Sequence, residues 1–208
     1  MARDTSPKCK KCRREGAKLF LKGERCSSIK CAMTKRSYAP GQHGQARRMA
    51  LSEFGTQLRE KQKVKRTYGM MEAQFKKYYE IASRMKGNTG NLLASLLEKR
   101  MDNVVYRLGM ASSRNQARQL VNHGHFLLNG KKMDIPSCLI SVGDVISLKS
   151  DKSNYVRDLK NLIKNYQAPS WLALDVKKIE GKVVSDPVLK EIDTNIDVHL
   201  IIEYYSKS

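Results

Sequence analysis

The chain has 208 residues, 40% of them hydrophobic, enough to build one large domain or two small ones. Forty lysines and arginines stand against twenty acidic residues, giving a formal net charge of +20 and a pI of about 9.9. This balance predicts a polyanionic partner, with nucleic acid as the first choice and an acidic membrane surface as the second. The sequence shows neither a signal-peptide pattern nor a run of about 18 apolar residues, so we expect a reducing cytosol, without secretion and without a membrane-spanning segment.

The positive charge is concentrated toward the N-terminus. Net charge is +11 over residues 1–48, +5 over 49–97, +4 over 98–150 and zero over 151–208. A surface that serves only solubility would not place more than half of the excess in the first of these segments. We therefore expect nucleic acid to bind the first three segments, and the neutral last segment to contact protein.

Four of the five cysteines lie in the first segment, as the pairs Cys9-x2-Cys12 and Cys26-x4-Cys31. In a reducing compartment, clustered cysteines indicate metal ligands before disulfides. Four thiolates complete the tetrahedron of a structural zinc site and leave no open position for catalysis. We predict one zinc ion here; an iron–sulfur cluster, free thiols and labile disulfides are the alternatives. The fifth cysteine, Cys138, has apolar neighbours and is expected to be buried.

Residues 34–48 (TKRSYAPGQHGQARR) combine glycine and proline with basic and amide side chains. This composition predicts an extended, irregular arm. Arms of this kind bind phosphates along their length, and the rings of Tyr38 and His43 could stack on bases. A plain flexible linker is the alternative.

From Leu51 to Lys86 the apolar residues recur at helical spacing, with a break at Gly69. A loop follows at residues 86–91, and a further helical stretch then begins. Together with the basic run at residues 59–66, this region predicts an all-helical domain that has a basic face of its own.

Residues 98–149 predict two helices followed by a small sheet. Ser113 and Gln116 form a capping-box pattern at the start of the second helix, and Gly124 is a good helix terminator. The dipeptide Asn129-Gly130 is a strong hairpin signal. The pattern therefore places the start of the second helix, with its hydroxyl, amide and guanidinium groups, at a ligand-binding surface.

Two arginines, Arg114 and Arg118, lie one turn apart in this second helix. We expect them to share an outward face and to reach successive phosphates. The alternative is that the two arginines only keep the surface of the helix soluble.

The last segment predicts a helix over residues 155–166 and a strand near 178–184. Alternation of Val198, Leu200 and Ile202 predicts a final strand. This segment is neutral and rich in aromatic residues at its end, which suits packing against protein.

The predicted fold class is α+β, with a zinc knuckle and extended arm, an all-helical domain, an inserted helix–helix–sheet RNA-binding module and short C-terminal strands. The expected domains are 1–48 for the knuckle and arm, 49–97 with 151–208 for the helical domain, and 98–150 for the module. No acid–base constellation or nucleotide-binding loop occurs, so we expect no enzymatic activity.

The stretch DNVVYRLGMASSRNQARQLVNHGHFLLNGKKMDIPS closely resembles the small RNA-binding module that is named after the fourth small-subunit ribosomal protein. Pseudouridine synthases and tyrosyl-tRNA synthetases carry the same module. The stretches YAPGQHGQARR, LREKQKVKRTYGMMEAQF, GDVISL and HLIIEYYSK resemble the remainder of the bacterial family of that ribosomal protein, so the resemblance runs nearly end to end. Departures are Met101, where leucine is expected, and Ala39, where proline is usual.

The resemblance implies a structural component of cytoplasmic ribosomes that binds the 5′ domain of 16S ribosomal RNA early in assembly. It implies the third and fifth small-subunit proteins as neighbours, an effect on decoding accuracy, and in some members repression of their own messenger RNA. Members occur with and without the four cysteines. The RNA contacts that it implies are Arg36, Tyr38, His43, Arg47, Arg48, Arg107, Ser113, Arg114, Gln116, Arg118 and Lys131.

Two functions of other classes compete with this one. An RNA-modifying enzyme could carry the module as an appendage, but the remaining residues are already assigned to the knuckle, the arm and the helices. A zinc-dependent DNA-binding regulator is the second. Activity on a bare transcript would reveal the enzyme, and competition by duplex DNA would reveal the regulator.

Overall fold

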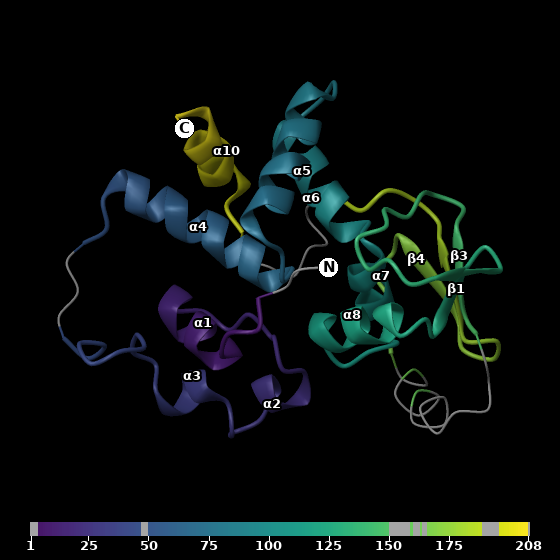
Figure 1. Ribbon diagram of the computed structural model, residues 1–208, viewed down its shortest axis with the longest axis horizontal. Coiled ribbons are helices and arrows are strands. Elements are labelled where there is room, and N and C mark those ends of the chain that lie inside the picture. The colour runs from purple at the N-terminus through teal and green to yellow at the C-terminus, as the bar shows by residue number, and fades with distance from the viewer. Residues whose placement is uncertain are drawn as a thin grey trace. The chain divides into compact units, whose positions relative to one another are not determined.

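The structure is a computed structural model that describes residues 4–46, 50–149, 159, 163, 166–188 and 196–207. The chain divides into two compact units, Met1–Leu93 with Asp193–Ser208, and Ala94–Ile192. The described helices of the first unit are α1 (Lys8–Glu15), α2 (Glu24–Ser27), α3 (Ala32–Lys35), α4 (Glu53–Thr67), α5 (Glu72–Arg84) and α10 (Val198–Ser206), and α6 (Thr89–Glu98) contains the boundary between the units (Figure 1). The second unit contains α7 (Met101–Arg107), α8 (Arg114–Asn122), β1 (Phe126–Leu128), β2 (Lys131–Met133), β3 (Val145–Leu148), β4 (Leu172–Asp175) and β5 (Glu180–Val183).

In the part of the chain that the structure describes, no helix combines the length and the apolar character that a membrane crossing requires.

The N-terminal part of the first unit consists of three short helices around a small apolar cluster. Gly16 ends α1 in the left-handed conformation, which turns the chain back on the helix. Cys12, Leu19 and Leu21 are buried together, and Met33 packs against them. So small a cluster offers this part of the chain little hydrophobic stabilisation.

Helices α4 and α5 form where the sequence predicts them. Ser52 caps α4, because its Oγ accepts a hydrogen bond from the backbone N–H of Gly55 (3.1 Å). Gly69, with a φ of 64°, ends the helix as expected. Phe75 and Ala82 are fully buried on one face of α5, which confirms the predicted apolar stripe.

The predicted final strand is wrong, because residues 198–206 form the helix α10. Asp197 caps it by accepting a hydrogen bond from the backbone N–H of His199 (3.0 Å). Three alternating apolar positions are too few to separate a strand from a helix, since Val198, Ile201 and Ile202 also satisfy helical spacing. Ile201 is buried, and α10 packs against α4.

Charged and aromatic side chains hold α10 in the first unit. The carboxylate of Glu72 accepts hydrogen bonds from Lys61 Nζ (2.6 Å), Lys65 Nζ (2.7 Å) and Tyr205 Oη (2.9 Å). The ring of Tyr205 stacks on that of Tyr79, with the two centroids 4.6 Å apart. Burial by itself raises the pKa of Glu72, but the three hydrogen bonds outweigh it and lower this pKa to about 2.

Glu72 should therefore make the stability of the protein depend on pH in the acid range. Its folded pKa is lower than the ordinary value of 4.5, so its contribution is complete above about pH 4.5 and is lost as the pH falls through about 2. In Glu72→Gln, thermal unfolding followed by circular dichroism should show a flatter fall of Tm between these pH values. Glu80→Gln, at an exposed position of the same helix, is the control; equal profiles for both variants and wild type would contradict the prediction.

The second unit is built on a five-stranded antiparallel sheet with the order β2-β1-β3-β5-β4. Asn129 and Gly130, with φ of 50° and 78°, form the tight turn between β1 and β2, which confirms the predicted hairpin. Strand β5 pairs with β3, so the sheet draws in residues beyond the 98–150 range given for the module.

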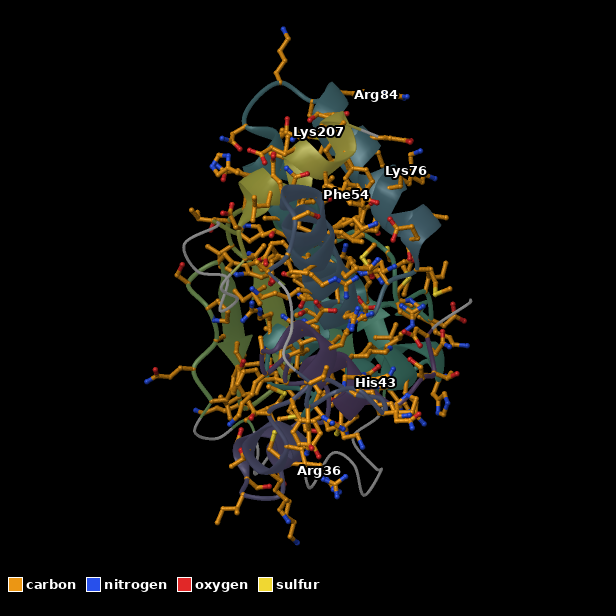
Figure 2. All side chains as sticks on the ribbon, turned by 90° about the vertical axis from the view of Figure 1, so that its left-hand side faces the viewer. Arg36, His43, Phe54, Lys76, Arg84 and Lys207 are labelled. Carbon is orange, nitrogen blue, oxygen red and sulfur yellow. The ribbon has the colours of Figure 1, made fainter. Side chains whose placement is uncertain are left out.

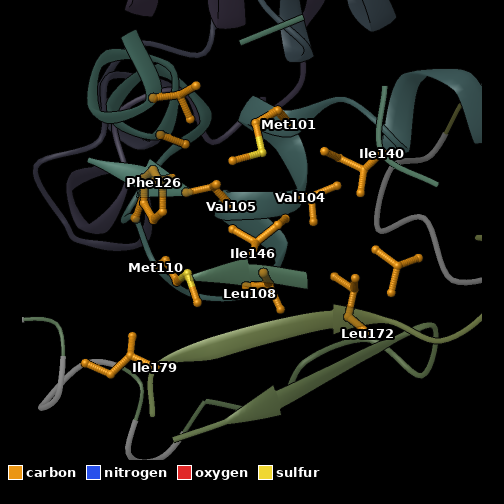
Figure 3. Packing of buried hydrophobic residues seen from close by; sticks show 14 of the residues in the cluster. Met101, Val104, Val105, Leu108, Met110, Phe126, Ile140, Ile146, Leu172 and Ile179 are labelled. Carbon is orange, nitrogen blue, oxygen red and sulfur yellow. The ribbon is translucent and has the colours of Figure 1, made fainter. Parts of the chain in front are cut away.

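Helices α7 and α8 pack against this sheet to form the main core (Figure 3). Val104, Val105 and Leu108 of α7 are fully buried, as their helical spacing predicts. Cys138, expected to be buried, is only partly buried at the margin of this core. Most of the helix predicted over 155–166 lies outside the described residues.

Candidate nucleic-acid interface and cysteine pocket

Three short helices bring the four N-terminal cysteines to one place. Cys9 and Cys12 lie one turn apart on α1, Cys26 lies in α2, and Cys31 is the N-cap residue of α3. All four line a single small pocket, together with Leu21. The structure thus brings to one pocket two pairs that are fourteen positions apart in the sequence.

The thiols of this pocket are free, and the described residues contain no group of three or more His, Cys, Asp or Glu side chains arranged to hold a metal ion. Burial raises the pKa of Cys12, and the charges of the other three cysteines raise it further, against a hydrogen bond from the backbone of Leu19. The backbone N–H of Lys22 donates to Cys26 Sγ (3.3 Å). The neighbouring cysteines thus disfavour ionisation of the Cys12 thiol, and a cation bound in this pocket would remove this penalty.

The predicted stacking residue Tyr38 already contacts another side chain. The guanidinium carbon of Arg13 lies 4.7 Å from the centroid of the Tyr38 ring. Arg13 also donates from Nε to the carbonyl oxygen of Tyr38 (2.9 Å) and from Nη2 to that of Ala39 (3.0 Å). The arm is therefore fastened to α1 at this point, and one face of the ring is covered by a cation.

Other residues predicted to contact RNA have side chains that are accessible to solvent. Arg36 follows α3, and its side chain and that of His43 are exposed (Figure 2). Arg47 and Arg48 lie outside the described residues. In the second unit, Lys131 is exposed on the edge strand β2.

The exposed side of α5 extends the basic surface of the first unit. Lys76 and Arg84 project from this helix (Figure 2), and Lys77 is exposed beside them. The basic run at residues 59–66, on which the expected basic face rested, does not form one: Lys61 is buried and binds Glu72, and Arg59 and Arg66 bind Glu15. Exposed basic residues of the helical region lie on α5 instead.

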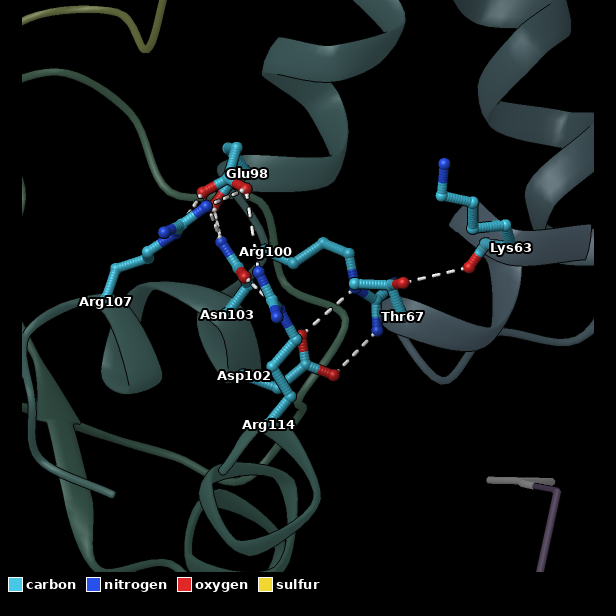
Figure 4. A network of polar contacts seen from close by, with 8 residues as sticks. All are labelled: Lys63, Thr67, Glu98, Arg100, Asp102, Asn103, Arg107 and Arg114. Atoms are coloured by element: carbon cyan, nitrogen blue, oxygen red, sulfur yellow. Dashed lines mark hydrogen bonds and ion pairs between the residues drawn. The ribbon is translucent and has the colours of Figure 1, made fainter. Parts of the chain in front are cut away.

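A buried polar network connects α6, α7 and α8 in the second unit (Figure 4). Arg107 donates to Glu98 twice, from Nε to Oε2 (3.0 Å) and from Nη2 to Oε1 (3.1 Å). Asn103 Nδ2 donates to the same carboxylate (2.8 Å). Asn103 Oδ1 in turn accepts from Arg114 Nε (2.7 Å), and the Arg114 guanidinium lies 4.7 Å from the centroid of the Tyr106 ring.

Asp102 is the second centre of this network. Arg100, which is fully buried, donates to it from Nε (3.1 Å) and from Nη2 (2.8 Å). Arg118 Nη1 donates to Asp102 Oδ2 (3.1 Å) from α8. The two carboxylates thus bind arginines from different helices and fix how α8 lies on α7.

The expected outward face of Arg114 and Arg118 is therefore wrong. The side chain of Arg118 is 9% exposed and that of Arg114 is 12% exposed. Arg107 is also buried. The spacing of the arginines does not reveal which carboxylates lie opposite them in the folded chain. A signal was present in the sequence: Glu98 and Asp102 are the only acidic residues between positions 98 and 118, a stretch that also contains Arg107, Arg114 and Arg118.

The start of α8 follows the predicted pattern with one difference. Ser113 caps the helix, since its Oγ accepts from the backbone N–H of Gln116 (3.3 Å). The side chain of Gln116 turns to Ser112 instead, where Oε1 accepts from the backbone N–H (2.8 Å) and from Oγ (2.7 Å). Gly124, with a φ of 72°, terminates α8 as predicted.

The family is shown by comparison with known proteins. A family profile described as "Ribosomal protein S4/S9 N-terminal domain" matches residues 3–98, and one described as "S4 domain" matches residues 99–146. Small ribosomal subunit protein uS4 of Clostridioides difficile is 57% identical, with full coverage of both chains. This chain belongs to the ribosomal S4 family. It is also 57% identical to uS4A of Alkaliphilus oremlandii and 53% identical to uS4 of Halothermothrix orenii, again over both full lengths.

The S4 family membership confirms the resemblance that the sequence motifs indicated. The relatives are structural ribosomal proteins, so the expectation that this chain is not an enzyme is confirmed. The zinc-binding form and the individual RNA contacts stay predictions.

Proposed function

We propose that this chain is a structural component of the small ribosomal subunit that binds the 5′ domain of 16S ribosomal RNA and nucleates assembly. The observation that supports it most is the match of an S4 domain within a chain whose excess charge of +20 lies wholly outside its last segment. A chain with this charge attracts phosphates at long range, and accessible side chains such as Arg36, His43 and Lys131 would make the direct contacts.

Protein neighbours belong to the same proposal. Residues 151–208 have no net charge, and Val176, Val184 and Val188 are exposed apolar residues within them. Such a surface suits contacts with the third and fifth small-subunit proteins, through which the chain would affect decoding accuracy on cytoplasmic ribosomes. Binding to its own messenger RNA, and repression of it, would use the same RNA-binding residues.

The arginines of the buried network take a different role in this proposal. Arg107, Arg114 and Arg118 would act mainly by holding α7 and α8 in a fixed arrangement, because their guanidinium groups bind carboxylates of the protein. The start of α8, with Ser113 and Gln116, would then meet the RNA as a preformed surface.

The test is chemical footprinting and a salt titration of the full chain on a transcript of the 16S 5′ domain. We expect stoichiometric binding, and Arg36→Ala and Lys131→Ala should each lower the log–log salt slope by roughly 0.7–0.9. Lys207→Ala, an exposed lysine of the neutral segment, is the control. Turnover of the transcript would favour the enzyme, and equal competition by duplex DNA would favour the regulator.

The four cysteines would hold one zinc ion as part of the same proposal. Their chemistry suits zinc, because all four line one pocket and four cysteine thiolates are a common ligand set of structural zinc sites. Bound zinc would supply folding free energy and no catalysis. Its effect would be to tie α1, α2 and α3 together around an apolar cluster too small to do so alone.

Reduced, purified protein should therefore contain one zinc ion per chain by elemental analysis. Cys12→Ser should lose the metal, whereas Cys138→Ser, outside the pocket, should retain it. Chelation should increase hydrogen exchange in residues 4–46 and leave α7 and α8 protected, because the core of the second unit does not involve the pocket. A metal-free protein, or collapse of the whole chain on chelation, would contradict this prediction.

A further inference from the structure

An aromatic side chain is exposed in the most basic segment of the chain, at Phe20. The leucines on both sides of it, Leu19 and Leu21, are buried in the small cluster of the N-terminal part. Phe20 itself is 46% exposed, and its backbone has a φ of 48°, in the left-handed region. Within the described residues, its ring makes no stacking or cation–π contact.

Both the left-handed backbone conformation and the exposure to solvent disfavour phenylalanine at position 20. Residues with a Cβ rarely adopt the left-handed conformation, and asparagine or glycine adopts it more readily than a bulky aromatic residue. An exposed ring also gains little from folding. Burial of Leu19 and Leu21 accounts for the turn of the chain, but it does not account for an aromatic side chain at its outer position. Backbone strain of this kind clusters at functional sites.

The surroundings of this ring indicate which ligand it would bind. Lys18 and Lys22, two positions to either side, are exposed, and neither side chain forms a hydrogen bond or ion pair with the described residues. The segment 1–48 has a net charge of +11. An apolar protein partner would have to bury these cations, whereas the phosphates of a nucleic acid would neutralise them.

We propose that Phe20 stacks on an unpaired base of the bound RNA while Lys18 and Lys22 bind the phosphates beside that base. Base–aromatic stacking tolerates any sequence, and it pairs naturally with cations that follow the backbone. This inference rests on the proposed binding to 16S ribosomal RNA and assigns a stacking contact within it.

The first test separates RNA binding from stability, because the two should respond in opposite directions. Phe20→Asn should leave Tm unchanged or raise it, since asparagine tolerates the left-handed backbone. Its affinity for the 5′-domain transcript should fall by roughly 5- to 50-fold. Phe20→Tyr should keep most of the affinity. Ile29→Ala, at an exposed apolar position of the same segment with an ordinary φ, is the matched control and should bind as wild type does.

The second test observes the stacking directly. Trp171 is the chain's single tryptophan and is buried in the second unit, so Phe20→Trp adds one accessible indole. Its fluorescence should be quenched when the transcript binds, with wild type as the background.

Three outcomes would overturn the proposal in distinguishable ways. Unquenched fluorescence, with wild-type affinity in Phe20→Asn, would overturn the stacking contact and leave RNA binding in place. Wild-type affinity of Phe20→Asn for RNA, with poorer incorporation into reconstituted subunits, would assign Phe20 to a protein contact. Failure of the wild-type chain to bind the transcript would overturn the proposed function itself.

Discussion

Asp102→Ala should lower the free energy of unfolding by about 3–5 kcal/mol, the cost of removing one partner from a buried ion pair. Asp102 accepts hydrogen bonds from Arg100 on one side and Arg118 on the other, and all three side chains are buried. Without the carboxylate, two guanidinium groups would remain near each other in a medium that screens their repulsion poorly. The measurement is urea unfolding followed by the fluorescence of Trp171, which lies in the same unit.

The control for this substitution is an acidic residue on the surface of the same unit. Asp134 pairs with Lys132 at 3.7 Å, and both side chains are 55% exposed, so Asp134→Ala should cost less than about 1 kcal/mol. Equal costs for the two substitutions would show that the buried network does not stabilise the module. Unfolding data should also accompany any RNA-binding measurement on Arg118 variants, because loss of this contact disturbs how α8 packs.

Gly181→Ala should destabilise the same unit by about 1–3 kcal/mol through overpacking. A Cβ at this position of β5 would lie 2.3 Å from Leu108 Cδ1 and 2.6 Å from Leu108 Cδ2. Leu108 is fully buried between α7 and the sheet (Figure 3), so its side chain has no space into which it could move. The glycine is what permits α7 to approach the sheet this closely.

A double-mutant cycle tests this explanation. Leu108→Ala alone should cost about 2–5 kcal/mol, because it leaves a cavity. In the double variant, the added Cβ partly fills that cavity, so the combined cost should be smaller than the sum by about 0.5–3 kcal/mol. Additive costs would show that Gly181 is required for a reason other than its contact with Leu108.

The sequence by itself determined the elements whose signals are local. Helix ends at Gly69 and Gly124, the cap at Ser113 and the Asn129-Gly130 turn each depend on a few neighbouring residues and on left-handed backbone conformations that glycine and asparagine adopt easily. The helical spacing of apolar residues in α5 and α7 likewise predicted which face of each helix is buried. The family, and with it the absence of enzymatic activity, also followed from motifs within the sequence.

Only the tertiary structure decided where the charged and ambiguous residues lie. Arg118 carries the same charge as a surface arginine, and it is buried because Asp102 comes to it from another helix. The arm is likewise held at Tyr38 by Arg13, which is twenty-five positions away in the chain. Alternation at the C-terminus was compatible with strand and helix alike, and packing against α4 selects the helix. In each case the free energy that selects the arrangement comes from a contact between distant residues, and a local pattern does not contain that information.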